Sequence, residues 1–292
     1  MRIFNAICIA GLSLTVILLS GCNSTRSIST DSKTVVSNDI AYGPSDAQTL
    51  DVYAPSDANN APIIFMVHGG AWRFGDKATG AVVENKVSRW VEKGFVFVSV
   101  NYRLLPEAGP REQVVDIVSA LKFVQTHAST QGGDPSKIIL MGHSAGAHLV
   151  SIVAVSKAII NDPELTPWLA TVSLDTAAFD IEKLMSRKHF GLYDRAFGDD
   201  RNYWRAVSPS ALLEISGKPM LLVCSTTRRD QPCNDAEQFA QKARSLGTQV
   251  ELLKVAMSHR DINAELGADG AYTGQVEQFM RSIEPSIGAL LE

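Results

Sequence analysis

The sequence predicts an α/β fold, with an eight-stranded, mostly parallel sheet flanked by helices, and two observations support this fold class. From residue 62 onwards, strand-like apolar runs alternate with helical patterns, as in chains built from β–α–β units. In addition, a serine between glycines, in Gly142-His143-Ser144-Ala145-Gly146, follows one such run where a helical pattern starts. The chain of 292 residues therefore suits one large domain behind a short N-terminal segment.

Eight strand-like runs can be placed in order along the chain. The first two surround Gly43-Pro44-Ser45-Asp46, whose composition predicts a hairpin turn. The expected strands cover residues 33–42, 48–54, 62–67, 95–100, 138–141, 170–174, 219–224 and 249–255. The expected helices cover residues 79–93, 111–127, 145–158, 235–246 and 272–283, and Asn234 with Glu237 forms a capping pattern before the fourth. This order favours a sheet covered on both faces.

The N-terminus predicts an export signal rather than part of the fold. Arg2 precedes an almost uninterrupted apolar stretch over residues 3–19, and Leu19-Ser20-Gly21-Cys22 follows. The pattern resembles a bacterial lipoprotein signal of residues 1–21, with cleavage before Cys22 and lipid attached to its sulfur. The alternatives are an ordinary signal peptide or a short anchor helix, because the stretch is near the lower length limit for spanning a bilayer.

Residues 22–38 are rich in Ser, Thr and Asn and predict a flexible tether ahead of a domain at 39–292. Asn23 follows the lipidated cysteine, which favours the outer membrane. We therefore expect an exported protein, lipid-anchored in the bacterial envelope and facing the periplasm. The formal net charge is −4 and no run of lysine or arginine occurs, so a nucleic-acid partner is not expected.

Ser144 has the sequence context of a nucleophile. The glycines around it permit the sharp strand-to-helix turn that exposes a serine hydroxyl at the edge of a sheet. A second glycine turn, His68-Gly69-Gly70-Ala71-Trp72, follows the apolar run at 63–67. Cleavage of an ester or amide through a tetrahedral intermediate places negative charge on the carbonyl oxygen, which fixed N–H groups stabilise. We expect these donors to be Gly69 or Gly70 together with Ala145.

The two glycine motifs, with Asn101-Tyr102-Arg103-Leu104 between them, resemble those of the α/β-hydrolase esterases related to hormone-sensitive lipase. They also resemble the kynurenine formamidase and feruloyl-esterase-like branches. The resemblance covers about residues 50–279. It implies an α/β-hydrolase fold with a serine, aspartate and histidine triad in that order, the acid following the seventh strand and the base following the eighth.

The expected base is His259, which follows the eighth strand, because an imidazole that titrates near pH 6.5 can accept and return a proton at neutral pH. The expected acid is Asp230, in the loop after the seventh strand. Asp235 is an alternative. It falls in the first turn of an expected helix, however, where a carboxylate is favourable for the helix dipole alone. Asp175 and Asp180, after the sixth strand, remain further candidates.

An insert at about 176–218, between the sixth and seventh strands, predicts a small cap over the site. Its concentrated aromatic residues suit an apolar acyl or aryl pocket, although packing of the insert onto the sheet explains each of them as well. No charged clamp is apparent in the insert, which favours a small neutral ester, with short-chain or aryl groups, as substrate. The expected pocket residues are Trp72, Phe74, Tyr193 and Trp204.

Cys224 and Cys233 are the two cysteines left for the folded domain after the signal and the lipidation site. In an exported protein they form either a disulfide or two unrelated thiols. Neither lies near the other His or Cys ligands that zinc needs, so a metal site is not expected. Hydrolysis by a serine, a histidine and an acid requires no cofactor, and none is expected.

These features predict a serine carboxylic ester hydrolase that works through an acyl-enzyme. The same constellation would serve an arylformamidase-like or other small-amide hydrolase. A binding module without activity on a hydrolase fold is the alternative from another class, and the sequence leaves the oligomeric state open.

Overall fold

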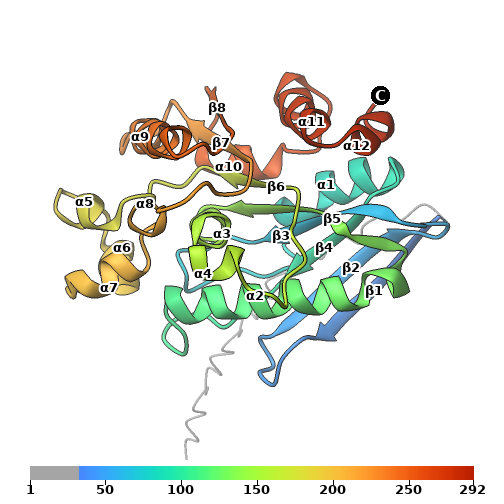
Figure 1. Cartoon of the computed structure of the whole chain (residues 1–292), viewed down its shortest axis with the longest axis horizontal. Coiled ribbons are helices and arrows are strands. Elements are labelled where there is room, and N and C mark those ends of the chain that lie inside the picture. The colour runs from blue at the N-terminus through green and yellow to red at the C-terminus, as the bar shows by residue number, and fades with distance from the viewer. Residues whose placement is uncertain (1–32) are drawn as a thin grey trace, which may run out of the picture.

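Eight strands form one sheet in the order β1-β2-β4-β3-β5-β6-β7-β8 (Figure 1). The structure is a computed structural model and describes residues 33–292. The strands β1, β2 and β4 pair antiparallel, and every pair from β4 to β8 is parallel. The predicted fold class is therefore confirmed. The strands are β1 (Thr34–Ala41), β2 (Thr49–Pro55), β3 (Ala61–Val67), β4 (Val96–Val100), β5 (Gly133–His143), β6 (Ala170–Leu174), β7 (Met220–Ser225) and β8 (Val250–Val255).

The predicted hairpin of β1 and β2 is present, and the Tyr42 N–H closes it by donating to Gln48 O at 3.0 Å. Residues 34–38, which belong both to the predicted tether at 22–38 and to the first predicted strand at 33–42, lie in β1, where Val36 pairs with Tyr53. The strand prediction is therefore confirmed, and the predicted tether extends too far, because pairing with β2 orders these residues. The predicted signal at 1–21 and the lipidation site Cys22 lie outside the described residues. In residues 33–292, no helix has the length and apolar character needed to cross a membrane.

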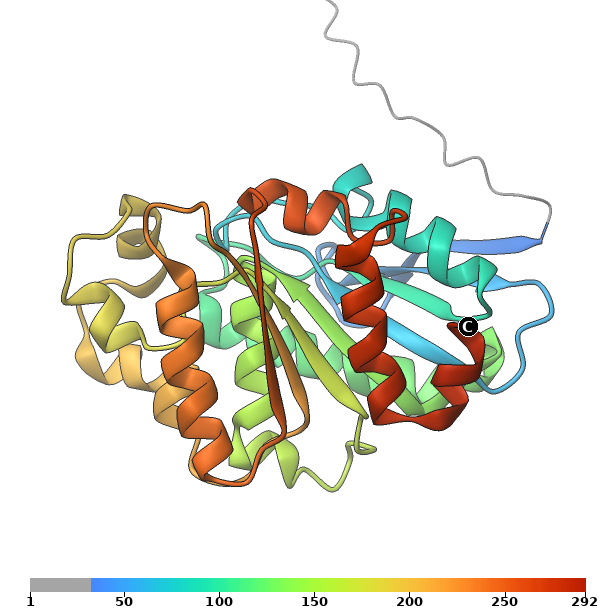
Figure 2. The same ribbon diagram turned by 90° about the horizontal axis from the view of Figure 1, so that it is seen from above.

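The longer helices cover both faces of the sheet (Figures 1 and 2). Because neighbouring strand residues point to opposite faces, Phe65 packs into one apolar core and Met66 into the other. On the Phe65 face lie α2 (Pro110–His127), α3 (Ala145–Val155) and α9 (Pro232–Ser245), and on the other face lie α1 (Gly80–Glu92), α10 (His259–Ala264), α11 (Ala271–Ile283) and α12 (Pro285–Leu290). Two short helices connect elements, η1 (Ala128–Gln131) and α4 (Lys157–Ile160).

Two boundaries of the predicted helices differ from the prediction by more than one residue. The helix α3 ends at Val155 because Ser156 is extended, and α4 follows as a separate turn. The helix α9 begins at Pro232, so Asn234 lies inside its first turn and is not the cap. Proline suits a first helical position because it has no N–H that would need a partner there.

The insert between β6 and β7 folds into four short helices that gather at one end of the sheet, on the left in Figure 1. Buried side chains such as Ile181, Leu184 and Phe197 join it to the core. The predicted cap is thus a packed helical layer. Its helices are α5 (Ile181–Met185), α6 (Gly191–Phe197), α7 (Arg201–Ala206) and α8 (Pro209–Leu212).

A disulfide joins Cys224, at the end of β7, to Cys233, in the first turn of α9, which decides between the two alternatives for these cysteines. The two residues are nine positions apart. Closing a loop of this length contributes about 2–3 kcal/mol through the lost entropy of the unfolded chain. The bridge therefore fixes both ends of the loop that contains Arg228, Arg229 and Asp230.

Candidate active site

Ser144 occupies a sharp turn between β5 and α3. Its backbone has φ 57° and ψ −115°, and its N–H donates to Leu174 O of β6 at 2.9 Å. Neighbouring backbone leaves no room for side chains at the flanking glycines. A Cβ atom on Gly146 would lie 2.2 Å from Val67 O, and one on Gly142 would lie 2.4 Å from Gly146 O. The glycines are therefore required for the close approach of β3, β5 and α3 that presents the serine.

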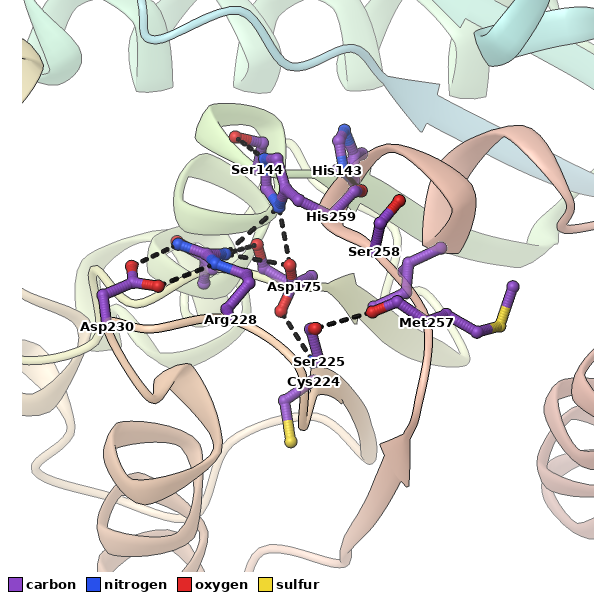
Figure 3. A network of polar contacts seen from close by, with 12 residues as sticks. His143, Ser144, Asp175, Cys224, Ser225, Arg228, Asp230, Met257, Ser258 and His259 are labelled. Carbon is purple, nitrogen blue, oxygen red and sulfur yellow. Dashed lines mark hydrogen bonds and ion pairs between the residues drawn. The ribbon is translucent and has the colours of Figure 1, made fainter.

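His259 begins α10 immediately after the loop that follows β8 and touches Ser144 as predicted (Figure 3). Its Nε2 lies 2.9 Å from Ser144 Oγ, and its Nδ1 lies 2.6 Å from Asp175 Oδ2. The main chain of His259 is also held, because its carbonyl accepts from His143 Nε2 at 2.8 Å. With Nδ1 donating to Asp175, Nε2 is the atom that can accept the serine proton.

The acid beside His259 is Asp175, and the choice of Asp230 is wrong. Asp175 directly follows β6 and is fully buried, whereas the Asp230 carboxylate contacts Nε and Nη2 of Arg228 and not the imidazole. Figure 3 shows Asp175 in contact with both His259 and Arg228, with Asp230 on the far side of that arginine. The alternative Asp235 is also excluded by position, since it pairs with Lys183 and Arg187.

Three donors hold the Asp175 carboxylate. Besides His259, they are the Ser225 N–H at 2.8 Å and Arg228 Nη1 at 2.9 Å. Burial alone would raise the pKa of Asp175, but these hydrogen bonds and the charge of Arg228 hold it below its usual value. Asp175 is therefore ionised at neutral pH, as an acceptor for the imidazole N–H must be.

A sequence signal for Asp175 exists, because it follows the buried run at 170–174 directly and parallel strands end at the same edge of a sheet. The resemblance directed attention to the seventh strand instead. Arg228 lies in the loop after that strand, and its guanidinium contacts the triad. Arg228 Nη1 lies 3.1 Å from His259 Nδ1. Which loop supplies the acid is a tertiary property that neither loop's composition reveals.

The cavity at Ser144 has a volume of about 400 Å³, and both Ala71 and Ala145 line it. Gly69 lies behind the turn, where a Cβ would be 2.9 Å from Ser144 Cβ, and Gly70 adopts φ +130° to turn the chain. The Ala145 N–H opens α3 and therefore has no acceptor within its helix. Ala71 is a candidate oxyanion donor that the sequence did not single out, although it stands in the same motif as Gly70.

The other histidines near the site are structural. His148 accepts from Trp72 Nε1 at Nδ1 and donates from Nε2 to Val207 O, so it is neutral. Burial lowers the pKa of His148 to about 4 and that of His143 to about 3. Burial also lowers the pKa of His68. None of the three reaches Ser144 Oγ, which leaves the base position to His259.

Two of the four expected pocket residues line this cavity. Trp72 and Tyr193 are buried, and their rings pack together at a centroid distance of 5.9 Å. Phe74 is 62 % exposed outside the cavity, and Trp204 packs against the cap while its indole N–H donates to Phe197 O. Phe190, one of the aromatic residues of the insert that suited a pocket, also lines the cavity. Several other lining residues were not expected, which are Thr176, Ala177, Leu192, Arg228 and Arg229. Among residues 33–292 there is no group of three or more potential metal ligands.

The sheet, the cap and the contact from Ser144 through His259 to Asp175 define an α/β-hydrolase fold with a serine-hydrolase arrangement. The chain belongs to the BD-FAE family, whose model matches residues 50–242. Solved esterases share the fold. Esterase B from Lactobacillus rhamnosis has a TM-score of 0.71 and 18% identity, covering 89% of this chain and 87% of its own. The apo form of Thermogutta terrifontis esterase 2 has a TM-score of 0.69 and 23% identity, covering 86% and 95%.

Curated relatives are also esterases by name. The probable carboxylic ester hydrolase LipM of Mycobacterium tuberculosis is 37% identical over 84% of this chain and 61% of its own length. The isoprenylcysteine alpha-carbonyl methylesterase ICME of Arabidopsis thaliana is 29% identical over 78% of this chain and 57% of its own length. The chain thus spans between half and two thirds of the length of these relatives.

Proposed function

We propose that the protein is a serine carboxylic ester hydrolase that acts on small esters, with short-chain or aryl groups, through an acyl-enzyme. The observation that carries this proposal is the unbroken line of contacts from Ser144 Oγ through His259 to Asp175, at the wall of a cavity. Membership of the BD-FAE family and the named activities of the curated relatives support it.

In this mechanism Ser144 Oγ attacks the ester carbonyl while His259 Nε2 accepts its proton over 2.9 Å. The buried Asp175 carboxylate stabilises the resulting imidazolium through Nδ1. The developing oxyanion is held by the N–H of Ala145 and by those of the Gly70–Ala71 turn, and His259 then protonates the leaving alcohol. Water, activated by the same imidazole, releases the acid from Ser144.

Purified domain 33–292 is expected to hydrolyse p-nitrophenyl acetate or butyrate faster than a formanilide, and Ser144→Ala should remove that activity. Removing a triad member costs about a millionfold in kcat in well-studied serine hydrolases, which here means a rate indistinguishable from background. Initial rates for both proteins on the three substrates test this. A preference for the formanilide would favour a small-amide hydrolase, and equal rates for both proteins on every substrate would overturn the serine mechanism.

We also propose that the protein is exported and attached to the bacterial envelope through lipid on Cys22. The sequence Leu19-Ser20-Gly21-Cys22 after an apolar stretch supports this placement. In cells that express the full chain and are fed radioactive palmitate, the protein should carry the label, and Cys22→Ser should abolish the labelling. Equal labelling of the two proteins, or no labelling of either, would contradict lipid attachment at this cysteine.

A further inference from the structure

A second cavity, of about 510 Å³, adjoins the cavity at Ser144. The two share Phe190, Tyr193, Arg229 and Asp230 as walls, so a substrate bound at Ser144 can extend past the aromatic rings into the second space. We call this second cavity the annex. Its remaining walls include Arg187, Lys188 and His189 of the cap, so cations are concentrated there.

Most charges around the annex are already paired. Arg187 Nη2 lies 2.5 Å from Asp235, and His189 Nε2 lies 2.8 Å from Asp194. Asp230, which also contacts Arg228 (Figure 3), is the one acidic residue that lines the annex, against three basic ones, Arg187, Lys188 and Arg229.

Two cations remain. Lys188 and Arg229 line the annex, both are exposed, and neither has an ion-pair partner among residues 33–292. One comes from the cap and the other from the loop after β7, where the disulfide fixes the loop ends. Arg229 therefore stands where the two cavities meet, and Lys188 lines the annex alone. Together they place two unpaired cations beyond Ser144, next to the aromatic rings of Phe190 and Tyr193.

We propose that the annex binds a carboxylate at the far end of the ester substrate, so that the preferred substrates carry an anionic group beyond an apolar segment. This inference rests on the proposed esterase function. The ester carbonyl lies at Ser144, the apolar segment contacts Tyr193 and Phe190, and the carboxylate meets Arg229 and Lys188. A guanidinium matches a carboxylate in shape and in hydrogen-bond donors.

The proposal refines the expectation of a neutral substrate, which rested on the lack of a charged clamp in the insert. The clamp is divided between two segments, Lys188 in the cap and Arg229 after β7, and only the fold brings them to one cavity. The ester itself remains small. The added feature is the anionic group at its distal end.

Matched substrate pairs test the proposal with the carboxylate on either side of the ester. On the acyl side, 4-nitrophenyl hydrogen glutarate is compared with the 4-nitrophenyl ester of glutaramic acid, its neutral isostere. On the alcohol side, 4-acetoxybenzoate is compared with 4-acetoxybenzamide. Two partly exposed ion pairs predict a preference of about 5- to 30-fold in kcat/KM for the anionic member of at least one pair. The difference should lie mainly in KM, because the carboxylate is bound equally in the ground and transition states.

The variants Arg229→Gln and Lys188→Gln should each reduce that preference, and the double variant should abolish it while hydrolysis of the neutral esters persists. Arg201→Gln is the matched control, since Arg201 lies in the same cap, is exposed, pairs with Glu182 and lines neither cavity. It removes the same charge and should leave the preference unchanged. Raising the salt concentration should weaken the preference of the native protein.

Three outcomes would overturn the proposal. Equal kcat/KM values within both pairs, with Ser144-dependent hydrolysis intact, would refute the carboxylate site and leave the esterase function standing. A preference that survives in the double variant, or that Arg201→Gln removes equally, would refute the roles of Lys188 and Arg229. Absence of Ser144-dependent hydrolysis of any ester would overturn both this proposal and the proposed function.

Discussion

Asp175→Asn is expected to lower kcat on a p-nitrophenyl ester by about 10,000-fold, as the equivalent change does in a serine protease triad. The amide cannot accept from Nδ1–H of His259 without rotating, and its N–H₂ favours the tautomer with the proton on Nε2. That tautomer cannot take the proton of Ser144. The contact that would be lost is the 2.6 Å hydrogen bond between Asp175 and His259.

Asp230→Asn is the matched control, because it makes the same chemical change in the residue that the sequence favoured. The Asp230 carboxylate touches Arg228 and not the imidazole, so its loss should change kcat by no more than about tenfold, the scale of a partly exposed ion pair. Steady-state kinetics of both variants decide between the two carboxylates. A loss in Asp230→Asn as large as that in Asp175→Asn would return Asp230 to the catalytic centre.

Gly146→Ala is expected to destabilise the fold by more than about 4 kcal/mol or to prevent accumulation of soluble protein. The added Cβ would lie 2.2 Å from Val67 O and 2.5 Å from His68 O. Both are backbone atoms at the end of β3, so no side chain can move to make room. The helix α3 would have to move away from the sheet, together with Ser144.

Gly274→Ala, near the start of α11, is the control for this stability measurement. Nothing lies within 4 Å of its added Cβ, so the change should stabilise the helix by about 0.5–1 kcal/mol. Urea unfolding of the two variants and the parent measures both effects. A midpoint for Gly146→Ala close to that of the parent would contradict the tight packing of α3 against β3.

The features that the sequence predicts best are those that a short segment determines by itself. The β5 strand, the glycines around Ser144 and the start of α3 form one continuous segment, so the nucleophile is recognisable without the fold. His259 is recognisable for the same reason, because it lies shortly after the last strand.

The features that the sequence left undecided or did not reveal depend on segments far apart in the chain. Asp175 and Arg228 come from loops after different strands and meet only because β6 and β7 are neighbours. Composition likewise places aromatic residues near the cap without showing which way they face. Tyr193, in α6, faces the cavity, whereas Trp204, in α7, packs within the cap and donates to Phe197 O.

The acid of the triad follows β6, so the loop after β7 supplies no member of the triad. The sequence of that loop can therefore vary more than the sequence of a loop that carries a triad residue. Its ends are fixed by the bond between Cys224 and Cys233 and by the Ser225 N–H, which holds Asp175. Its tip at residues 229–231 borders the annex without supplying an atom to the bond-breaking step. Evolution, or a designed library, can therefore alter substrate choice at this tip while the chemistry itself stays intact.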